Sequence, residues 1–241
     1  MQSLTFIAGG SKGLGAALVK IFENNQHEVL EFSRSGQQAN HIDCDFNQTE
    51  KALHTFKQTF AKVDEKSVNS INLVINTAVL QPFGSLLKAD EHTIEQHIHI
   101  NITATMYLLK AFITAFQQTP CKKTISYISS GAARRDIPGL AMYSASKAFF
   151  ERFIDTTATE QKDCDHPIDC MIINPGVMDT GMQVEIRAQD KADFPMVNMW
   201  QDLHDQGKLA QPKAIAEVCF NLITHTGQNS GYYTAQNYLR Q

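Results

Sequence analysis

The sequence predicts an α/β protein with a doubly wound parallel sheet and helices on both of its faces. Short apolar runs recur along the chain and alternate with segments of helical periodicity. The first apolar run ends in a glycine-rich turn that leads into a helical segment. The 241 residues are 43% hydrophobic and show no linker, repeat or low-complexity segment. We therefore expect residues 1–241 to form a single domain.

The bulk composition excludes several classes of function. A net charge of -4 provides no basic field for nucleic acid or anionic lipid. The five cysteines are odd in number and form no C-x-x-C pair, which indicates free thiols in a reducing compartment. No apolar run approaches the roughly 20 residues that span a bilayer, and the start of the chain lacks the pattern of a signal peptide. We expect a soluble, cytoplasmic protein that binds neither membrane nor nucleic acid.

The first strand is expected at residues 4–8, and a glycine turn follows it. The spacing of this turn is G-x-x-x-G-x-G, and a helical segment comes directly after it. Glycines here allow a tight turn and let the backbone approach a pyrophosphate, which the free N–H groups of the following helix attract. The turn therefore predicts a dinucleotide site that includes Gly9, Ser11, Lys12, Gly13, Leu14 and Gly15.

The second strand, at residues 27–33, predicts which dinucleotide binds. It ends in Ser33 and Arg34, and Lys12 lies in the glycine turn that faces it. Sites that prefer NAD carry an acid here for the ribose 2′-hydroxyl, whereas a cation accommodates a 2′-phosphate. Glu31 should lie too deep to meet the ribose. Two cations and no acid at the strand end favour NADP; the alternative is that Arg34 is a solvated loop residue.

Residues 41–46 are expected to form a short third strand. Asp45, followed by Phe46, could accept a hydrogen bond from an adenine amino group, although Asp43 is a rival and either could begin a turn. A helix is expected at residues 49–61, because its apolar residues form one stripe. The fourth strand, at residues 71–75, is followed by Asn76, Thr77 and Ala78.

Residues 91–116 have helical periodicity throughout and predict one long helix. Within it Asn101 stands between two isoleucines, and a buried asparagine needs hydrogen-bond partners. His92, His97 and His99 lie nearby, but their spacing does not place all three on one helix face. We interpret them as structural or solvated; the alternative is a metal site, and we expect no metal.

The fifth strand, at residues 124–129, is followed by Ser130, and a helical stretch at 137–151 contains Tyr143 and Lys147. A spacing of four residues puts these two side chains on one helix face. A nearby ammonium favours the phenolate and is expected to lower the pKa of the tyrosine. A surface pair with a packed ring is the alternative, because this spacing is common on ordinary helices.

The remaining elements are a sixth strand at 169–173, a loop at 175–180, a helix at 212–224 and a last strand at 231–239. Between them, residues 181–210 have a looser pattern of methionine and aromatic residues among charges. Such side chains suit a bulky apolar or aromatic substrate. We predict that this segment is a mobile substrate lid; the alternative is an ordinary packed pair of helices.

Taken together, these motifs resemble the short-chain dehydrogenase/reductase family, which has a Rossmann-type fold. The resemblance spans nearly the whole chain: the glycine turn, Asn76-Thr77-Ala78, Asn101, Ser130, Tyr143-x-x-x-Lys147, and Pro175-Gly176 with Thr180. The family's N-N-A-G reads Asn76-Thr77-Ala78-Val79 here, and Ala8 stands where the family has threonine. Both departures could alter the stability of the loops. The likeness is greatest to sepiapterin-reductase-like and benzil-reductase-like members.

The resemblance implies NADPH-dependent reduction of a ketone, such as a 1,2-diketone like benzil or a pterin side-chain ketone. Tyr143 would act as the general acid, Ser130 would bind the carbonyl oxygen, and Lys147 would hold the nicotinamide ribose. Asn101 would hold a water that links Lys147 to solvent. The remaining cofactor contacts would come from Asn76, Ala78 and the loop residues Pro175, Gly176, Val177 and Thr180, with Tyr143 and Lys147 also touching the cofactor.

Two other functions remain open at this stage. The protein could be an alcohol dehydrogenase that acts on a sugar, a steroid or an acyl thioester. It could also be a non-catalytic regulator that binds NADPH, because a fold does not fix a function. The family usually forms dimers or tetramers through its long helices, so the resemblance implies a homodimer, with a tetramer as the alternative.

Overall fold

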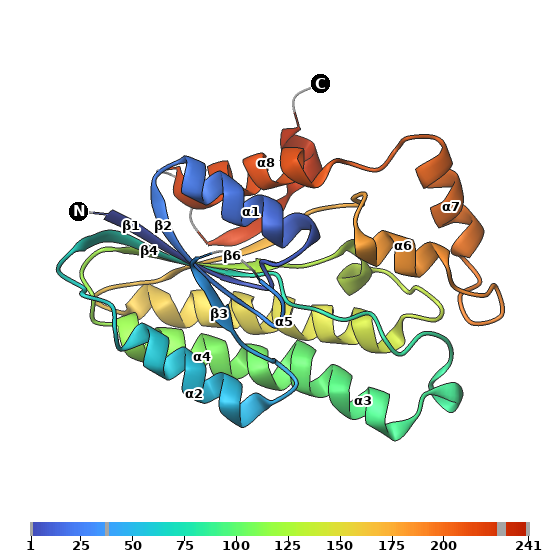
Figure 1. Cartoon of the computed structure of the whole chain (residues 1–241), viewed down its shortest axis with the longest axis horizontal. Coiled ribbons are helices and arrows are strands. Elements are labelled where there is room, and N and C mark those ends of the chain that lie inside the picture. Colours follow the sequence, from blue (N-terminus) through green and yellow to red (C-terminus); the bar gives the residue numbers. More distant parts are fainter. Residues whose placement is uncertain (1, 37–38, 226–229, 240–241) are drawn as a thin grey trace.

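The computed structural model describes residues 2–36, 39–225 and 230–239. Its seven parallel strands form one sheet in the order β3-β2-β1-β4-β5-β6-β7, with helices on both faces (Figure 1). This confirms the predicted fold class. The strands are β1 (Gln2–Ala8), β2 (His27–Ser33), β3 (His41–Asp43), β4 (Val68–Ile75), β5 (Lys122–Ile128), β6 (Asp169–Asn174) and β7 (Gly231–Thr234).

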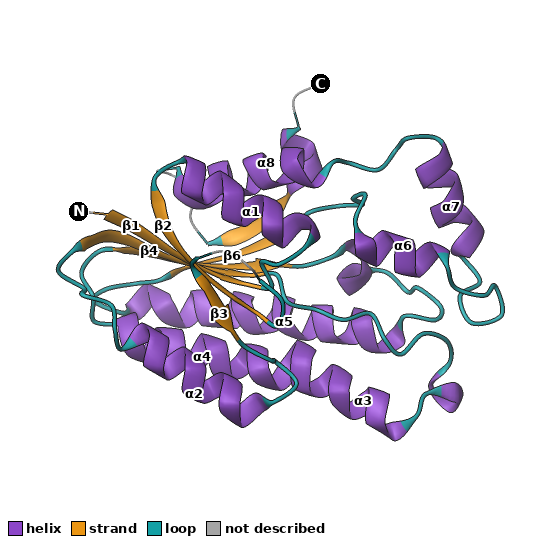
Figure 2. Ribbon diagram, viewed as in Figure 1, coloured by secondary structure: helices purple, strands orange, loops and turns teal. Residues whose placement is uncertain are grey.

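The helices form one layer on each side of the sheet, as Figure 2 shows. On one face lie α1 (Gly13–Asn24) and α8 (Pro212–Thr224), which contact each other. On the other face lie α2 (Thr49–Phe60), α4 (Ala104–Phe116) and α5 (Ala141–Glu160). Each layer closes over its own buried apolar cluster, so the parallel strands are covered on both faces.

The core beneath α2 and α4 contains a cluster of phenylalanine rings. Phe6 at the centre of β1 packs its ring against those of Phe32, Phe60, Phe112 and Phe116, with ring centroids 4.8 to 6.4 Å apart. Rings at such separations add edge and stacking contacts to the burial of their large apolar surface. This cluster fixes β1 and β2 against the helices, and both strands end at the predicted dinucleotide site.

The strand order creates a natural binding position. The chain leaves β1 toward β2 and β3 on one side, and then returns to build β4 to β7 on the other. In open parallel sheets, ligands bind at the carboxyl ends of the strands where the order reverses. The turns that follow β1 and β4 meet at this point.

Two strands are shorter than the sequence predicts, for reasons of pairing. The third strand was expected to reach residue 46, but β3 ends at Asp43 because its partner β2 ends at Ser33. The last strand was expected to reach residue 239, but β7 ends at Thr234 and a 3-10 helix follows at Ala235–Tyr238. Its partner β6 is followed by Pro175, which has no N–H to continue a ladder.

The predicted helix at 91–116 forms, but it is not uniform. It runs from α3 (Glu91–His97) through a π-helical segment (Ile98–Thr103) into α4. By length and composition alone, this 26-residue helix, which contains an 18-residue window with a mean hydropathy of 1.2, could cross a membrane. In the structure, however, Leu108, Phe112 and Phe116 on α4 are buried against the sheet, so the segment is a core helix of the domain.

All five cysteines are free thiols.

The segment at 181–210 contains two helices, α6 (Gly181–Arg187) and α7 (Val197–Asp205), which contact each other. They lie at the end of the molecule opposite the N-terminus (Figure 1). Phe194 between them is fully buried, and the neighbouring Asp193 forms an ion pair with Lys88. The segment contains two helices that pack against each other in this structure, and its role as a substrate lid stays a prediction.

Candidate active site

The glycine turn after β1 leaves an anion-binding helix terminus. Gly13 has a φ of +54°, a left-handed conformation that favours glycine. A Cβ atom on Gly15 would collide with the carbonyl oxygen of Gly9, so the turn can pack on the helix only without a side chain there. Lys12 is the N-cap residue of α1, and its side chain makes no capping hydrogen bond within the described residues. The first N–H groups of the helix therefore remain available for a phosphate.

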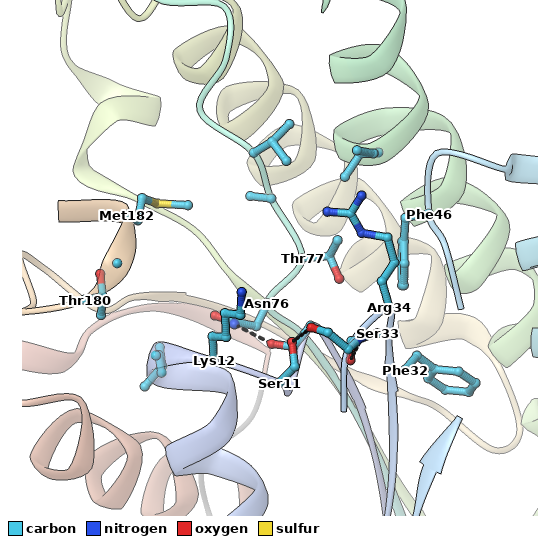
Figure 3. Close-up of a pocket in the computed structure, with 18 of the residues that line it drawn as sticks. Ser11, Lys12, Phe32, Ser33, Arg34, Phe46, Asn76, Thr77, Thr180 and Met182 are labelled. Carbon is cyan, nitrogen blue, oxygen red and sulfur yellow. Dashed lines mark hydrogen bonds between the residues drawn. The ribbon is translucent and has the colours of Figure 1, made fainter. Parts of the chain in front are cut away.

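A cavity of about 580 Å³ opens beside this turn. Its wall comes from the glycine turn, the ends of β2, β3 and β4, and the start of α6 (Figure 3). Most of the residues predicted to contact a dinucleotide line it: Gly9, Ser11, Lys12, Gly13, Leu14, Ser33, Arg34, Asp45, Phe46, Asn76, Ala78 and Thr180.

The predicted site residues that do not line this cavity are Gly15, Pro175, Gly176, Val177, Asn101, Ser130, Tyr143 and Lys147. Tyr143 instead belongs to a neighbouring apolar cluster with Leu140, Phe194 and Val197, against which Trp200 also packs. The loop after β6 is tied down: Gly176 donates its N–H to the Asn174 side chain, and the N–H of Ala210 bonds the carbonyl of Val177.

Two cations, Lys12 and Arg34, line one part of the cavity. Lys12 and Arg34 are exposed, and Figure 3 shows their side chains extending in the same direction from the glycine turn and the end of β2. Glu31 is fully buried below the cavity. Its carboxylate accepts hydrogen bonds from the Gly10 N–H at 2.8 Å and the Ser33 hydroxyl at 3.1 Å, and pairs with His41 Nδ1 at 2.8 Å.

Other polar groups define the rest of the cavity. Asp45 accepts hydrogen bonds from the N–H of Asn47 and the side chain of Gln48, so it begins a turn while it lines the wall. Asn76 donates to the carbonyl of Gly9 at 3.0 Å and holds the two turns together. The buried hydroxyl of Thr77, also in the wall, has no hydrogen-bond partner within the described part of the chain. An unsatisfied buried hydroxyl, two cations and a free helix terminus fit a phosphorylated, polar cofactor such as NADP.

The side chains of Tyr143 and Ser130 meet at the carboxyl end of β5. Tyr143 is near the start of α5, with 7% of its surface exposed, and Ser130 lies two residues after β5. Burial raises the pKa of Tyr143 to about 12, and a side-chain hydrogen bond with Ser130 acts in the opposite direction. Ser130 Oγ accepts the N–H of Ala132 at 3.1 Å, so its own hydrogen can point toward another acceptor.

Lys147 follows one turn later on α5 and is also buried. Its Nζ atom donates to the carbonyl of Ile128 at 2.7 Å and lies 5.8 Å from the centroid of the Tyr143 ring. Burial lowers the pKa of Lys147 to about 7. The sequence predicted that Lys147 would lower the pKa of Tyr143. In this structure the pKa of Tyr143 is raised instead, because desolvation of the phenol outweighs its hydrogen bond with Ser130.

Asn101 has partners on all sides. Its Oδ1 atom accepts the N–H of Val79 at 2.9 Å, and its Nδ2 atom donates to the carbonyl of Val79 at 2.9 Å. Nδ2 also lies 3.1 Å from His97 Nε2 and 3.3 Å from Ser146 Oγ. Asn101 therefore ties the π-helical segment to the turn after β4 and to α5, which carries Tyr143 and Lys147.

His97 is a buried structural residue that contacts Asn101, in agreement with the interpretation of these histidines as structural or solvated. It is buried, and its Nδ1 atom lies 2.6 Å from the carbonyl of Gln81, so Nδ1 donates and Nε2 accepts from Asn101. Burial lowers its pKa, which favours this neutral form. Their contact could be predicted from the sequence, because a spacing of four residues puts His97 and Asn101 on one helix face. The described residues contain no group of three or more potential metal ligands.

The chain is similar to known proteins in both sequence and fold. The sequence profile of the family described as "short chain dehydrogenase" matches residues 3–191. "Benzil reductase ((S)-benzoin forming)" of Bacillus subtilis is 31% identical over 99% of this chain and 100% of its own length. Among solved structures, "KRED1-Pglu enzyme" aligns with a TM-score of 0.81 at 24% identity, covering 96% of this chain and 100% of that one.

A second solved structure, "ElxO with NADP Bound", aligns with a TM-score of 0.74 at 20% identity over the whole of both chains. At such identities these two structures support the fold alone. The family profile covers well over half of the chain, and the bacterial relative matches from end to end. This protein belongs to the short-chain dehydrogenase/reductase family of oxidoreductases.

Proposed function

We propose that this protein is an NADPH-dependent carbonyl reductase that acts on a ketone. Its substrate is a 1,2-diketone such as benzil, with a pterin side-chain ketone as the second candidate. The observation that carries the proposal is a buried tyrosine that keeps its proton beside a serine hydroxyl, within an apolar cluster next to the cation-lined cavity. That arrangement suits protonation of a carbonyl oxygen in a site that excludes water.

Tyr143 is the proton donor in this proposal. A phenol whose pKa is about 12 stays protonated at neutral pH and can give its proton to an oxygen that becomes strongly basic. Ser130 donates a hydrogen bond to the same oxygen and stabilises the negative charge that develops there. When bound, NADPH supplies the hydride that reduces the carbonyl carbon.

Lys147 and Asn101 support the donor. The Lys147 ammonium would hold the nicotinamide ribose and place a positive charge beside the phenol. Asn101 would hold a water that returns a proton from solvent. Both hydrogens of its amide group are directed at protein acceptors, so such a water would bind the remaining lone pair of Oδ1.

NADPH is the cofactor that the cavity favours. Lys12 and Arg34 would bind its 2′-phosphate, and the free N–H groups at the start of α1 would bind the pyrophosphate. Ser33 adds a hydroxyl at the same wall, and Asp45 with Phe46 would lie beside the adenine. Thr180 and the loop 175–177 would cover the nicotinamide.

The apolar cluster around Tyr143 supports a bulky, hydrophobic substrate. Met182 and Ile186 of α6 and Val197 and Trp200 of α7 belong to it or pack against it. Aromatic diketones match such an apolar surface better than sugars do, because each buried sugar hydroxyl would need a partner. The similarity to the Bacillus subtilis enzyme, which is described as a benzil reductase, points to the same substrate class.

We also propose an oligomeric state and a compartment. Among the large apolar side chains that are exposed, Ile98, Met106 and Phe149 lie on the π-helical segment, α4 and α5. We propose a homodimer formed through α4 and α5, which light scattering would detect as twice the chain mass of 26.9 kDa, with a tetramer as the alternative. The free cysteines support a cytoplasmic location, which fractionation of cells would test.

The catalytic role of Tyr143 predicts a large loss of turnover in Tyr143→Phe. Removal of the phenolic proton should lower kcat by about 10²–10⁴-fold, the usual contribution of general acid catalysis. NADPH binding and circular dichroism should not change. The control is Tyr238→Phe, because Tyr238 is 48% exposed. Turnover near that of wild type in Tyr143→Phe would refute the assignment.

The two cations predict a cofactor preference. The double variant Lys12→Ala, Arg34→Ala should bind NADPH about 10- to 100-fold more weakly, since each charged hydrogen bond contributes about 1.5–3 kcal/mol before solvent screening. NADH binding should change little. Fluorescence titration measures both, and Lys51→Ala, which changes an exposed lysine on α2, is the control. Equal or better use of NADH by the wild-type enzyme would contradict the argument.

A panel of carbonyl compounds tests the substrate class. Consumption of NADPH should be fastest with benzil or phenylpropanedione, followed by sepiapterin, and slow with sugars, steroids and acyl thioesters. Preference for one of the last three would favour an alcohol dehydrogenase of another specificity. NADPH binding without turnover of any carbonyl would favour the non-catalytic regulator.

The helix pair α6–α7 is proposed to act as a substrate lid, because its residues reach both the cofactor cavity and the apolar cluster. If so, the segment 181–210 should be cut rapidly by protease in the free enzyme and slowly with NADPH and benzil present. Equal cleavage rates in both conditions would identify it as a fixed helix pair.

A further inference from the structure

Glu151 is a buried carboxylate that none of the proposed catalytic roles uses. It lies on α5, four residues after Lys147 and eight after Tyr143, so all three side chains lie on one side of the helix. Only 6% of its surface is exposed. A buried carboxylate is costly unless hydrogen-bond donors surround it, so its partners indicate what it does.

Both oxygens of Glu151 bond to the segment that carries Ser130. Oε1 accepts the hydroxyl hydrogen of Ser129 at 2.6 Å, and Oε2 accepts Nε–H of Arg134 at 2.6 Å. Ser129 directly precedes Ser130, and Arg134 ends the 3-10 helix that follows it (Gly131–Arg134). Glu151 thus fastens both ends of the segment 129–134 to the helix of Tyr143.

An aromatic ring covers the outer side of the pair formed by Glu151 and Arg134. The guanidinium carbon of Arg134 lies 3.6 Å from the centroid of the Tyr232 ring on β7. The Arg134 side chain is half exposed, whereas the carboxylate is buried. The pair therefore presents its cation toward solvent and its negative charge toward the interior, where Lys147 lies.

The interior charge acts on Lys147. Burial lowers the pKa of Lys147, and the negative charge of Glu151 acts in the opposite direction. The other titratable groups facing this lysine are Tyr127 on β5, Tyr143 on α5 and His97 on α3, and Lys147 contributes to the lowered pKa of His97. None of these three supplies a negative charge at neutral pH, so Glu151 supplies the charge that favours the ammonium.

We propose that Glu151 is a positioning residue of the active site with two effects: it clamps the Ser130 segment to α5, opposite Tyr143, and it keeps Lys147 in its ammonium form. The inference rests on the proposed role of Lys147 in holding NADPH. Neither effect requires Glu151 to touch substrate or cofactor. The clamp depends on the hydrogen bonds of Glu151, whereas its charge changes the pH at which Lys147 loses its proton.

Two variants should shift the pH dependence in opposite directions. Glu151→Gln removes the charge, and the Ser129 hydroxyl can turn to accept from the new amide while the amide oxygen accepts from Arg134. Lys147 should then lose its proton at lower pH. Arg134→Gln leaves the carboxylate charge less neutralised, so Lys147 should keep its proton to higher pH. Glu160→Gln, at the exposed end of α5, is the matched control.

The readout is the dissociation constant of NADPH, measured by fluorescence titration between about pH 6 and pH 9. This measurement needs no substrate, so it is independent of whether any carbonyl is reduced. At pH 8, Glu151→Gln should bind about tenfold more weakly than wild type, as a displacement of one pH unit would produce. At pH 6 the two should agree within about twofold.

The activity profile provides the second readout. With benzil, the fall of kcat/KM at high pH should begin at lower pH in Glu151→Gln and at higher pH in Arg134→Gln, while Glu160→Gln matches wild type. If the pH profiles of Glu151→Gln and Arg134→Gln are displaced in opposite directions, in binding and in activity alike, the proposal is supported. An equal loss at every pH, or profiles that superimpose on wild type, would overturn it. If Glu151→Gln does not fold, Arg134→Gln alone decides, since a displacement to lower pH or none would overturn it.

Discussion

The desolvation of Tyr143 and Lys147 is the interaction on which the rest of the site depends. Both side chains project from the first turns of α5 and are covered by β5, the π-helical segment and the cluster around Phe194. Burial favours the neutral form of each group, so the phenol keeps its proton while the ammonium gives it up more easily. The helix thus carries the Tyr143 phenol, which holds its proton well above neutral pH, beside the Lys147 amine, which titrates near neutral pH.

The sheet determines where this pair can act. Because the strand order reverses beside β1, the turns after β1 and β4 meet at one edge and leave a cavity with the glycine turn on its floor. Asn76 holds these two turns together, and Asn101 connects the second of them to α5. The cofactor cavity and the proton donor are therefore joined by hydrogen bonds through buried amide groups, which limits how far one can move without the other.

Much of this could be predicted from the sequence because it rests on local patterns. The glycine spacing, the cations at Lys12 and Arg34, and the separation of Tyr143 from Lys147 each depend on residues close together in the chain. The ends of β3 and β7 could not be predicted, because they depend on where the partner strands β2 and β6 stop. The same applies to the raised pKa of Tyr143, which reflects how many elements cover the phenol.

The π-helical turn at Ile98–Thr103 and the buried carboxylates belong to the same class of non-local features. Periodicity indicated a helix through Asn101 but not the widened turn in which it lies, with its amide bonded to the turn after β4. Glu31 and Glu151 have unremarkable sequence neighbours, yet one supports the glycine turn and the other the Ser130 segment. Their roles follow from donors that lie 17 to 22 residues away in the chain: the Gly10 N–H for Glu31, and Ser129 and Arg134 for Glu151.

The ionisation of Tyr143 tests the central claim most directly. Nuclear magnetic resonance of tyrosine labelled with ¹³C at Cζ, assigned with the Tyr143→Phe variant, would follow its ionisation in the unliganded enzyme as pH rises. We expect the Tyr143 signal to remain that of a phenol beyond about pH 10, where free tyrosine ionises, because burial raises its pKa to about 12. A phenolate signal below about pH 9, under the free-tyrosine value, would show that the charge of Lys147 outweighs desolvation and would contradict the account.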